Sequence, residues 1–528
     1  MSTTVERQPI AADAVQPARA LPTRTTAAVS GIIAAGAALA IGELIAAFLS
    51  GAPSPIAAVG AAVIDFAPPG SKEVAVALFG TNDKPAILVL ITLVVIAVGA
   101  GLGLLARRRP AFALAGIVAL VGIGLLAMLR LPDAELTASL FSAAVQAIVG
   151  IQVLMMLLGV APREGVAPTA ATGRRPFLVR ALGLGALAVV GGGIGRAMVE
   201  GRATQVAVAV TEIPQPVQPV SAPGPESSFD VAGITPLVVP NGDFYRIDTA
   251  LVTPSVNLAT WSLRVHGMVD TEVSLTFDQL VELPLIEQYV TIACVSNEVG
   301  GDLVGNAKWT GVRLTDVLDM AGVQAGATQI VPRSVDGWTA GFPTAWVTAP
   351  ERPREAMIAV KMNDEPLPAP HGFPARLIVP GLYGYVSATK WLSDIELTTL
   401  EAFDAYWVPR GWSKEAPILT QSRIDVPLWN SGVSAGPVAV AGVAWAPDRG
   451  ISRVEVRVDD GEWQNATIAT PIGPQTWVQW KWAWQAEPGD HVIAVRATDG
   501  AGAVQTDQVT PPDPDGARGY HTIGVRVA

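Results

Sequence analysis

The chain carries a single cysteine, which lies in the stretch Tyr289-Val-Thr-Ile-Ala-Cys294-Val-Ser-Asn-Glu-Val-Gly-Gly301. The β-branched residues before Cys294 predict a strand, and the glycine pair after it predicts a tight loop. A lone cysteine cannot form an internal disulfide, and it is too few for an all-cysteine zinc or iron–sulfur site. Cys294 is therefore either a small buried hydrophobe or one thiol that a strand delivers to a site.

The composition around this stretch divides the chain into two parts. The length of 528 residues suggests about three domains. Half of the residues are hydrophobic and 15% are charged, which is too apolar for an average soluble protein. The excess lies in residues 27–200, whereas residues 201–528 resemble ordinary globular sequence. The net charge of −11 argues against a nucleic-acid partner, because such proteins present a basic face.

The apolar part contains five runs long enough to span a bilayer, at residues 27–49, 85–106, 111–131, 138–160 and 177–199. We therefore predict a region of about five transmembrane helices over residues 27–200, preceded by a disordered Pro/Ala/Thr-rich segment at residues 1–26. The shorter run at residues 56–66 predicts an interfacial or re-entrant piece. Glu43, inside the first span, is either a functional group or a structural hydrogen-bonding partner.

Basic residues near the span ends predict the orientation. They fall on one side if the N-terminus is cytoplasmic, which places the part after residue 200 outside the cytoplasm; Arg130 is the exception. The residues are Arg19, Arg24, Arg107, Arg108, Arg109, Arg163, Arg174, Arg175 and Arg180. Arg174-Arg175-Pro-Phe-Leu also resembles an internal twin-arginine export signal, and ordinary flanking charge is the alternative. We expect a multi-pass protein of the cell membrane.

Three segments follow the spans. Residues 201–228 are rich in proline and predict an extended linker. Residues 229–425 predict a mixed α+β domain, with strands at 261–267 and 272–276 and helices at 276–282 and 312–321. Residues 426–528 alternate apolar and polar side chains and predict an immunoglobulin-like β-sandwich without a disulfide.

The α+β segment contains an ordered set of motifs. The cysteine stretch reads Cys294-x-x-Asn, and it is followed by Pro370-His371-Gly-Phe-Pro-Ala-Arg376 and Ser387-Ala-Thr389-Lys390-Trp. The turns Asn241-Gly-Asp-Phe-Tyr245-Arg246 and Ser334-Val-Asp336-Gly belong to the same set. Together they resemble the molybdopterin domain of the sulfite oxidase family of molybdenum enzymes. The resemblance covers residues 229–525, and it implies a sulfite-oxidase-like domain followed by a dimerisation domain.

The resemblance implies a molybdenum–molybdopterin cofactor with Cys294 as the protein ligand of the metal. A soft thiolate suits a metal that also binds the pterin dithiolene. It also implies that the cofactor's phosphate end meets basic and hydroxyl groups. The implied cofactor-binding residues are Asn241, Tyr245, Cys294, Asp336, His371, Arg376, Ser387, Thr389 and Lys390, and the implied catalytic residues are Cys294, Arg246 and Tyr245.

The implied activity is oxygen-atom transfer by a membrane-anchored, extracytoplasmic oxidoreductase that acts on a small oxyanion or an S-oxide. No haem segment is expected, so electrons would be exchanged with an external cytochrome, copper protein or quinone-linked partner. A homodimer through residues 426–528 is one arrangement that the resemblance implies.

The sequence departs from sulfite-oxidising members after the cysteine, where they carry arginine and this chain carries Glu298. The cations Arg246, Lys308, Arg313 and Arg410 are available to compensate. A methionine-sulfoxide-type reductase is therefore the alternative on the same centre. A thiol enzyme that pairs Cys294 with His371, and a non-catalytic cell-surface binding protein, are the alternatives from other classes.

Overall fold

The computed structural model of the protein describes residues 21–49, 51–68, 78–79, 83–162, 164, 173–208, 213–349 and 356–528. The chain forms two compact units, Met1–Val199 and Glu200–Ala528. Most of the segment predicted to be disordered, residues 1–20, lies outside the described residues, as do Arg163 and residues 209–212 of the predicted linker.

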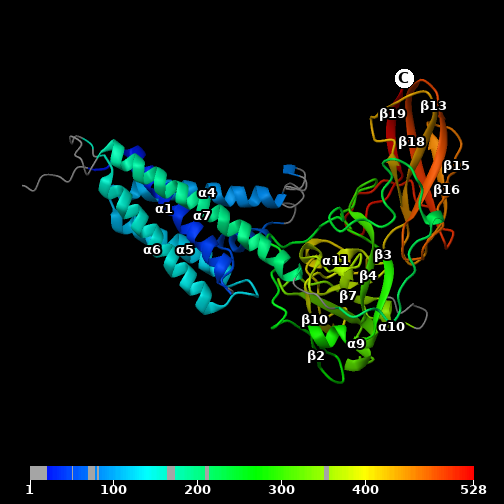
Figure 1. The fold of residues 1–528 in the computed structure, drawn as a ribbon, viewed down its shortest axis with the longest axis horizontal. Coiled ribbons are helices and arrows are strands. Elements are labelled where there is room, and N and C mark those ends of the chain that lie inside the picture. The colour runs from blue at the N-terminus through cyan, green and yellow to red at the C-terminus, as the bar shows by residue number, and fades with distance from the viewer. Residues whose placement is uncertain are drawn as a thin grey trace, which may run out of the picture. The chain divides into compact units, whose positions relative to one another are not determined.

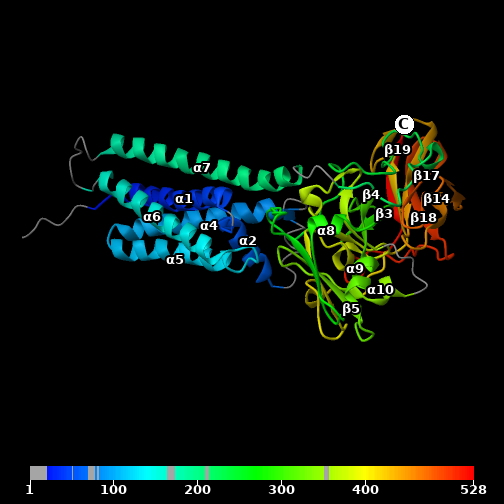
Figure 2. The ribbon, with the colours of Figure 1, turned by 60° about the horizontal axis from the view of Figure 1, so that its bottom comes forward.

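The first unit is helical (Figure 1, Figure 2). Five of its helices are long and apolar enough to cross a membrane, which confirms the predicted apolar helices. A shorter helix, α2, covers the run predicted to be interfacial or re-entrant. The helices are α1 (Arg24–Phe48), α2 (Pro55–Asp65), α4 (Asp83–Ala106), α5 (Pro110–Met128), α6 (Leu136–Val160) and α7 (Arg174–Val208).

Two predicted boundaries of the helical region are wrong. Helix α1 begins at Arg24, because the Thr23 hydroxyl accepts a hydrogen bond from the Thr26 N–H at 3.3 Å and caps the helix. Residues 24–26 are therefore helical and not disordered. Helix α7 continues to Val208, inside the predicted linker. The first proline after this helix is Pro214, so residues 201–208 contain no helix breaker.

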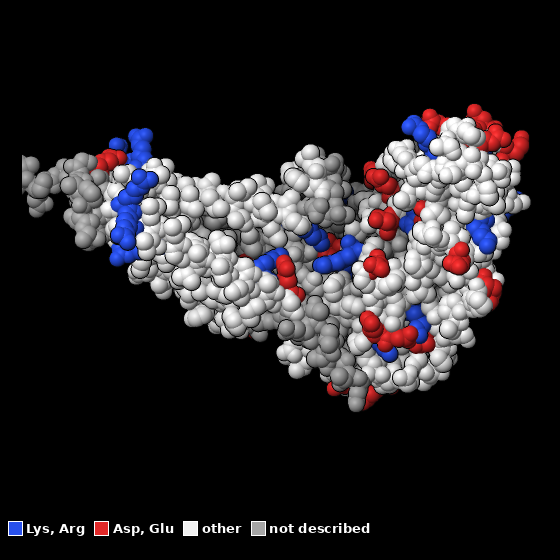
Figure 3. Space-filling model, turned by 45° about the horizontal axis from the view of Figure 1, so that its top comes forward, with Lys and Arg blue, Asp and Glu red and all other residues white. Residues whose placement is uncertain are grey.

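Basic side chains gather at one end of the helical unit (Figure 3). Thr23 N–H donates to the Pro162 carbonyl at 3.0 Å, and Arg107 Nε donates to the Pro22 carbonyl at 2.7 Å. These bonds bring together the start of α1 and the ends of α4 and α6. Arg130 lies elsewhere, where it pairs with Asp65 at 3.6 Å.

Glycine allows α1 and α4 to approach closely. A Cβ on Gly31 would lie 2.0 Å from the Gly99 carbonyl oxygen, and a Cβ on Gly103 would lie 2.0 Å from the Ala27 carbonyl oxygen. Such small-residue contacts let helices associate where the surrounding lipid is as apolar as their side chains. Further along α1, buried Glu43 accepts hydrogen bonds from Ser54 Oγ at 2.7 Å and from Ile56 N–H at 3.3 Å. Glu43 thus fastens the start of α2 to α1.

The second unit begins with two five-stranded sheets (Figure 1). One has the strand order β2-β1-β10-β5-β6, and the other has the order β3-β4-β7-β8 with β9 paired to β7. The bounds are β1 (Ser262–Gly267), β2 (Val273–Thr276), β3 (Leu285–Ala293), β4 (Val304–Arg313), β5 (Gln329–Ser334), β6 (Phe342–Pro343), β7 (Met357–Met362), β8 (Glu365–Pro366), β9 (Arg376–Ile378) and β10 (Leu392–Thr398).

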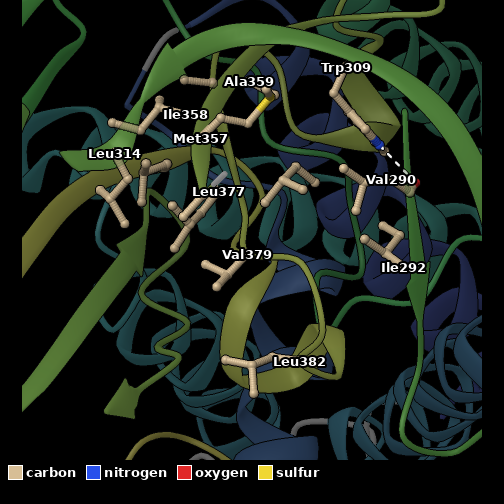
Figure 4. Packing of buried hydrophobic residues seen from close by; sticks show 14 of the residues in the cluster. Val290, Ile292, Trp309, Leu314, Met357, Ile358, Ala359, Leu377, Val379 and Leu382 are labelled. Atoms are coloured by element: carbon tan, nitrogen blue, oxygen red, sulfur yellow. Dashed lines mark hydrogen bonds between the residues drawn. The ribbon is translucent and has the colours of Figure 1, made fainter. Parts of the chain in front are cut away.

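Short helices connect these strands. They are α8 (Phe277–Val281), α9 (Leu314–Ala321), α10 (Ala345–Thr348) and α11 (Gly384–Ser387). Helix α8 has the capping box that Thr276 predicts, with Gln279 as its partner. Helix α9 begins two residues later than expected, because strand β4 continues to Arg313. Residues of β3, β4, β7 and β9 share a core, in which the Trp309 indole donates to the Val290 carbonyl at 3.3 Å (Figure 4).

The C-terminal part consists of two further sheets that share one hydrophobic core. Their strand orders are β11-β13-β17-β16 and β12-β19-β18-β14-β15. The bounds are β11 (Gln421–Val426), β12 (Gly432–Val433), β13 (Gly436–Trp445), β14 (Ile451–Val458), β15 (Gln464–Asn465), β16 (Thr467–Ile468), β17 (Val478–Ala486), β18 (Gly489–Asp499) and β19 (His521–Val527). Strand β11 pairs with β13, so these sheets begin at Gln421, before the boundary expected at residue 426.

The glycine contacts between α1 and α4 yield a test. We expect Gly103→Leu to lower the stability of the helical unit by about 1–3 kcal/mol, because the side chain collides with the α1 backbone. Gly101→Leu is the matched control on the same helix, since nothing lies within 4 Å of a Cβ there. Thermal unfolding in detergent, followed by loss of helical signal, measures both. Equal midpoints for the two variants would contradict the packing described.

Candidate functional site

Strand β3 ends at Ala293, and Cys294 begins a loop that is closed by hydrogen bonds within the loop. Cys294 N–H donates to the Leu303 carbonyl at 2.9 Å, and Asn297 N–H donates to the Cys294 carbonyl at 3.1 Å. The Asn297 side-chain oxygen accepts from Leu303 N–H at 2.8 Å. The thiol is 9% exposed, and its sulfur lies 2.9 Å from Ser296 Oγ. The loop therefore presents one sulfur in a defined position.

The Tyr245 hydroxyl and the end of β3 both lie close to Gly384. A Cβ on Gly384 would lie 3.5 Å from the Ala293 carbonyl oxygen and 3.9 Å from the Tyr245 hydroxyl. The first residue of α11 therefore packs closely against both the end of β3 and Tyr245. Burial raises the pKa of Tyr245 well above its usual value. The nearby Cys294 raises it further, and the guanidinium of Arg376 opposes the change. Tyr245 is thus a neutral phenol within electrostatic reach of both groups.

Arg376 is a buried cation at the start of β9. Its residue is 3% exposed, and its guanidinium carbon lies 5.1 Å from the centre of the Trp309 ring. Nη1 donates to the His371 carbonyl at 3.1 Å, and Nη2 donates to the Ala388 carbonyl at 3.4 Å. Nε has no hydrogen-bond partner among the described residues, and no described carboxylate pairs with this side chain. Burial lowers the pKa of Arg376 to about 10.

Two more buried polar atoms near Arg376 lack partners among the described residues: His371 Nδ1 and Thr389 Oγ1. The other ring nitrogen of His371, Nε2, lies 2.9 Å from the Asn241 carbonyl oxygen. Burial, with the charge of Arg376, lowers the pKa of His371 to about 4, so the imidazole is neutral at pH 7. Buried polar groups in proteins are almost always hydrogen-bonded, so the donors Arg376 Nε and Thr389 Oγ1 fit a ligand that carries acceptors. Because the hydrogen of neutral His371 is on Nε2, its Nδ1 fits a donor of the same ligand.

The chain turns tightly where these residues meet. Gly372 has φ of 115°, and a Cβ there would lie 2.9 Å from Lys390 Cα. Leu377 N–H donates to the Thr389 carbonyl at 2.9 Å. Glycine is therefore required for the His371–Arg376 segment to pack against the segment that carries Thr389 and Lys390.

Asp248 organises the remaining positive charge. It accepts from Lys390 Nζ at 2.9 Å and pairs with Arg246 Nε at 3.1 Å. Burial lowers the pKa of Lys390 to about 8, an effect that Asp248 opposes. Burial raises the pKa of Asp336, and Asp248 adds to that rise. The Arg246 side chain is 42% exposed.

Some predicted residues use their side chains within the fold. The Ser387 hydroxyl donates to the carbonyls of Leu382 at 3.1 Å and Tyr383 at 3.0 Å. The Asn241 amide donates to the Met362 carbonyl at 3.2 Å. Asp336 Oδ1 accepts from Trp338 N–H at 3.1 Å, as a turn aspartate does.

Three of the cations expected to compensate for Glu298 have partners of their own. Lys308 pairs with Asp364 at 2.5 Å, Arg313 donates to Gln218, and Arg410 stacks over the Tyr406 ring at 3.7 Å. Glu298 is exposed.

Sequence reasoning missed Asp248, Tyr383, Arg423 and His521. Arg423 Nη1 donates to the Gly301 carbonyl at 2.8 Å, and His521 contacts Gly300. Burial raises the pKa of Tyr383 to about 12, with a smaller contribution from Cys294. Asp248 and Arg423 lie outside the local motifs and reach the site only through tertiary pairing, so the sequence alone carries no signal for them. Tyr383 lies in the Pro/Gly-rich segment between Arg376 and Ser387, and His521 lies in the segment Arg518-Gly-Tyr-His521, which also resembles the family, but neither pattern marks these residues as part of the site.

The site thus combines a buried thiol at the end of β3 with buried cations and unpaired donors around β9. The thiol can bind a soft metal, and the cationic end can bind a phosphate. The residues therefore fit a cofactor that carries both groups.

Comparisons with known proteins agree. The family described as "Oxidoreductase molybdopterin binding domain" matches residues 250–407. Mitochondrial sulfite oxidase of Rattus norvegicus is 29% identical over 327 residues, 52% of this chain and 58% of that protein. The uncharacterized oxidoreductase YuiH of Bacillus subtilis (strain 168) is 33% identical over 156 residues, 30% of this chain and 74% of that protein.

A solved structure, the sulfane dehydrogenase SoxCD from Paracoccus pantotrophus, matches with a TM-score of 0.48 and 21% identity, over 58% of this chain and 86% of that chain. The chain thus spans little more than half the length of rat sulfite oxidase, whereas it covers most of YuiH. The predicted family and its molybdenum–molybdopterin cofactor are confirmed. The chain belongs to the family of oxidoreductases that carry a molybdopterin-binding domain.

Proposed function

We propose that this protein is a membrane-anchored, extracytoplasmic molybdenum-pterin oxidoreductase that performs oxygen-atom transfer, as a sulfite oxidase does. The observation that carries the proposal is that one domain holds both a buried thiol, Cys294, and a buried guanidinium, Arg376, that pairs with no carboxylate among the described residues. Both act on the same phenol, Tyr245. A buried cation without a counter-ion is costly, and an anionic ligand removes that cost.

The residues divide the binding of the cofactor between them. Cys294 would bind the molybdenum, and Arg376, His371, Thr389 and Lys390 would hold the phosphate end of the pterin. When bound, the cofactor supplies the two-electron oxygen-transfer chemistry. Arg376 can offer Nε in addition to the nitrogens it already uses, and Thr389 can offer its hydroxyl. The one hydrogen of neutral His371 is on Nε2 and goes to the Asn241 carbonyl, so Nδ1 presents an acceptor to the cofactor.

The other predicted residues shape the site. Asn241 positions His371 through its carbonyl oxygen. Ser387 remains predicted to lie at the phosphate end of the cofactor, and Asp336 remains predicted to face the pterin, from turns that their own side chains stabilise. Arg246 remains a predicted catalytic cation through its place beside Asp248.

Tyr245 has the protonation state that a substrate-binding donor needs. Its raised pKa keeps the hydroxyl protonated at neutral pH, so the phenol can donate a hydrogen bond to a substrate oxygen. Both an oxyanion and an S-oxide present such an oxygen.

One observation favours the second candidate, reduction of an S-oxide such as a methionine sulfoxide. The residue that follows the cysteine loop's Asn297 is the acid Glu298, while Lys308 and Arg313 are engaged elsewhere. A neutral S-oxide tolerates a nearby carboxylate better than a dianion does.

The contacts give less support to a thiol enzyme. The Cys294 sulfur contacts Ser296, and His371 contacts the Asn241 carbonyl, so the thiol and the imidazole have different partners. The family assignment also favours an enzyme over a non-catalytic surface protein.

Five apolar helices and their basic end support the membrane placement. Arg24, Arg107 and Arg174 would lie on the cytoplasmic side. An odd number of spans then places residues after 208 outside the cytoplasm. The electron partner would be an external cytochrome, a copper protein or a quinone-linked carrier, and the C-terminal sheets would support a homodimer.

Cys294 provides the direct test. Wild-type protein produced with molybdate should contain about one molybdenum and one pterin per chain, and it should turn over sulfite or a sulfoxide with artificial electron carriers. Cys294→Ser should lose at least about 100-fold in turnover, because a hydroxyl replaces the soft ligand. Wild-type protein without molybdenum under these conditions would refute the proposal, and the preferred substrate would decide between the two candidates.

Arg376→Met separates a binding role from a structural one. We expect retention of pterin to fall by about one to two orders of magnitude, as for a lost hydrogen bond to a charged group. The cofactor-free protein should be as stable as wild type or more stable, because an uncompensated buried charge has been removed. Arg264→Met, at an exposed pair with Glu272, should leave both measurements near wild type. Normal pterin retention in Arg376→Met would contradict the assignment.

The depressed pKa of His371 predicts acid sensitivity. Between pH 6.5 and about 4 the unfolded chain binds a proton that the folded chain excludes, so stability falls as the pH falls through this window. The loss for His371 is at most about 3 kcal/mol. In cofactor-free protein, His371→Asn should remove part of this loss, and His521, whose pKa is also lowered to about 4, should account for more. His491→Asn should keep the full loss. Denaturant unfolding of the wild type and these two variants at several pH values measures the difference.

A further inference from the structure

We propose that Arg423 and His521, both from the C-terminal sheets, are positioning residues that hold the loop carrying Cys294. The inference rests on the proposed role of Cys294 as the metal ligand. It gives the C-terminal sheets a part in the metal site in addition to any role in dimerisation.

Arg423 fastens the end of the loop. Its side chain is 9% exposed, and Nη1 donates to the Gly301 carbonyl at 2.8 Å. Nε donates to Asp425 Oδ1 at 2.7 Å, and Nη2 donates to Thr235 Oγ1 at 2.7 Å. Asp425 Oδ2 in turn accepts from Thr235 N–H at 2.9 Å. The guanidinium is therefore fixed by two partners, Asp425 and Thr235, in addition to its bond with the loop.

His521 fills the space beside the neighbouring glycine. Gly300 has φ of 79°, and a Cβ on it would lie 2.2 Å from His521 Cδ2. The ring is itself held, because Nδ1 accepts from Ile424 N–H at 2.9 Å. The loop can approach the C-terminal sheets this closely only because residue 300 has no side chain.

The strand that leads into the loop has an anchor of its own. Thr291 N–H donates to the Gln475 carbonyl at 2.9 Å, and Thr291 Oγ1 accepts from Trp477 N–H at 2.8 Å. The Trp477 indole donates to the Leu237 carbonyl at 2.8 Å. The C-terminal sheets and their loops therefore hold the chain both before and after Cys294.

These contacts fix the direction of the Cys294 sulfur, in addition to stabilising the packing of the loop against the C-terminal sheets. Cys294 lies between an anchor at Thr291 and an anchor at Gly300–Gly301, so movement of either one redirects the thiol. Groups that orient a metal ligand from outside usually change metal affinity or activity by about 10- to 100-fold when they are removed.

The test uses the full chain in detergent, with Arg423→Gln and the control Arg496→Gln. Arg496 is another partly buried arginine of the same sheets, paired with Glu455 at 2.9 Å and away from the cysteine loop. In cofactor-free protein we expect the amide hydrogens of Cys294 and Asn297 to exchange with solvent about tenfold faster in Arg423→Gln than in wild type. Alkylation of Cys294, the only cysteine, should accelerate similarly.

In cofactor-loaded protein, Arg423→Gln should shift the electron paramagnetic resonance signal of the molybdenum. Arg496→Gln should keep the wild-type rate of amide exchange, the wild-type rate of alkylation and the wild-type resonance signal. Arg423→Lys should restore part of each, since an ammonium can still reach the Gly301 carbonyl. His521→Asn serves as a second variant if Arg423→Gln does not fold, because its side-chain oxygen can replace Nδ1 while the contact with Gly300 is lost.

The inference is overturned if Arg423→Gln, or His521→Asn in its place, shows the exchange, alkylation and resonance of the Arg496→Gln control. Absence of molybdenum from wild type is a different result. It would refute the proposed function, while faster exchange and alkylation in the same variants would still establish that these residues hold the loop.

Discussion

The burial of the Arg376 guanidinium, with no carboxylate partner in the part of the chain that the structure describes, is the constraint on which the site depends. Most buried charges in proteins are paired, and an unpaired one lowers stability unless a ligand compensates it. The fold tolerates this cation by giving it two backbone carbonyls and the face of Trp309. These contacts fix the direction of the guanidinium and leave Nε available. An anion that binds here would therefore gain both a hydrogen bond from Nε and the compensation of a buried charge.

The thiol end of the site is built in another way. Cys294 needs no charge compensation while it is a thiol, so its position depends on hydrogen bonds of the loop backbone and on the C-terminal sheets. Tyr245 lies within electrostatic reach of both ends, because Cys294 raises its pKa and Arg376 lowers it. A cofactor that spans the distance between them would meet a soft ligand at one end and fixed positive charge at the other.

Much of this site could be predicted from the sequence because its motifs are local. Cys294 follows a β-branched run, and His371, Gly372 and Arg376 stand together in one short segment whose glycine has no allowed substitute at φ of 115°. The five apolar helices could be predicted for the same reason, since length and hydropathy are properties of contiguous sequence.

The remainder depends on tertiary pairing. Asp248 has no motif around it, yet it pairs with Lys390, 142 residues further along the chain. The start of the C-terminal sheets at Gln421 follows from the pairing of β11 with β13, which periodicity does not reveal. The end of α7 at Val208 was missed because composition alone does not mark where a helix stops before a proline-rich segment.

The loop that carries the thiol is completed by residues made long after it. Arg423 and His521 follow Cys294 by more than a hundred positions, so a growing chain presents the cysteine before either residue exists. During synthesis the loop remains incomplete until β11 and β19 have folded against it. We therefore expect the two pairs of sheets to assemble before the cofactor is inserted and retained.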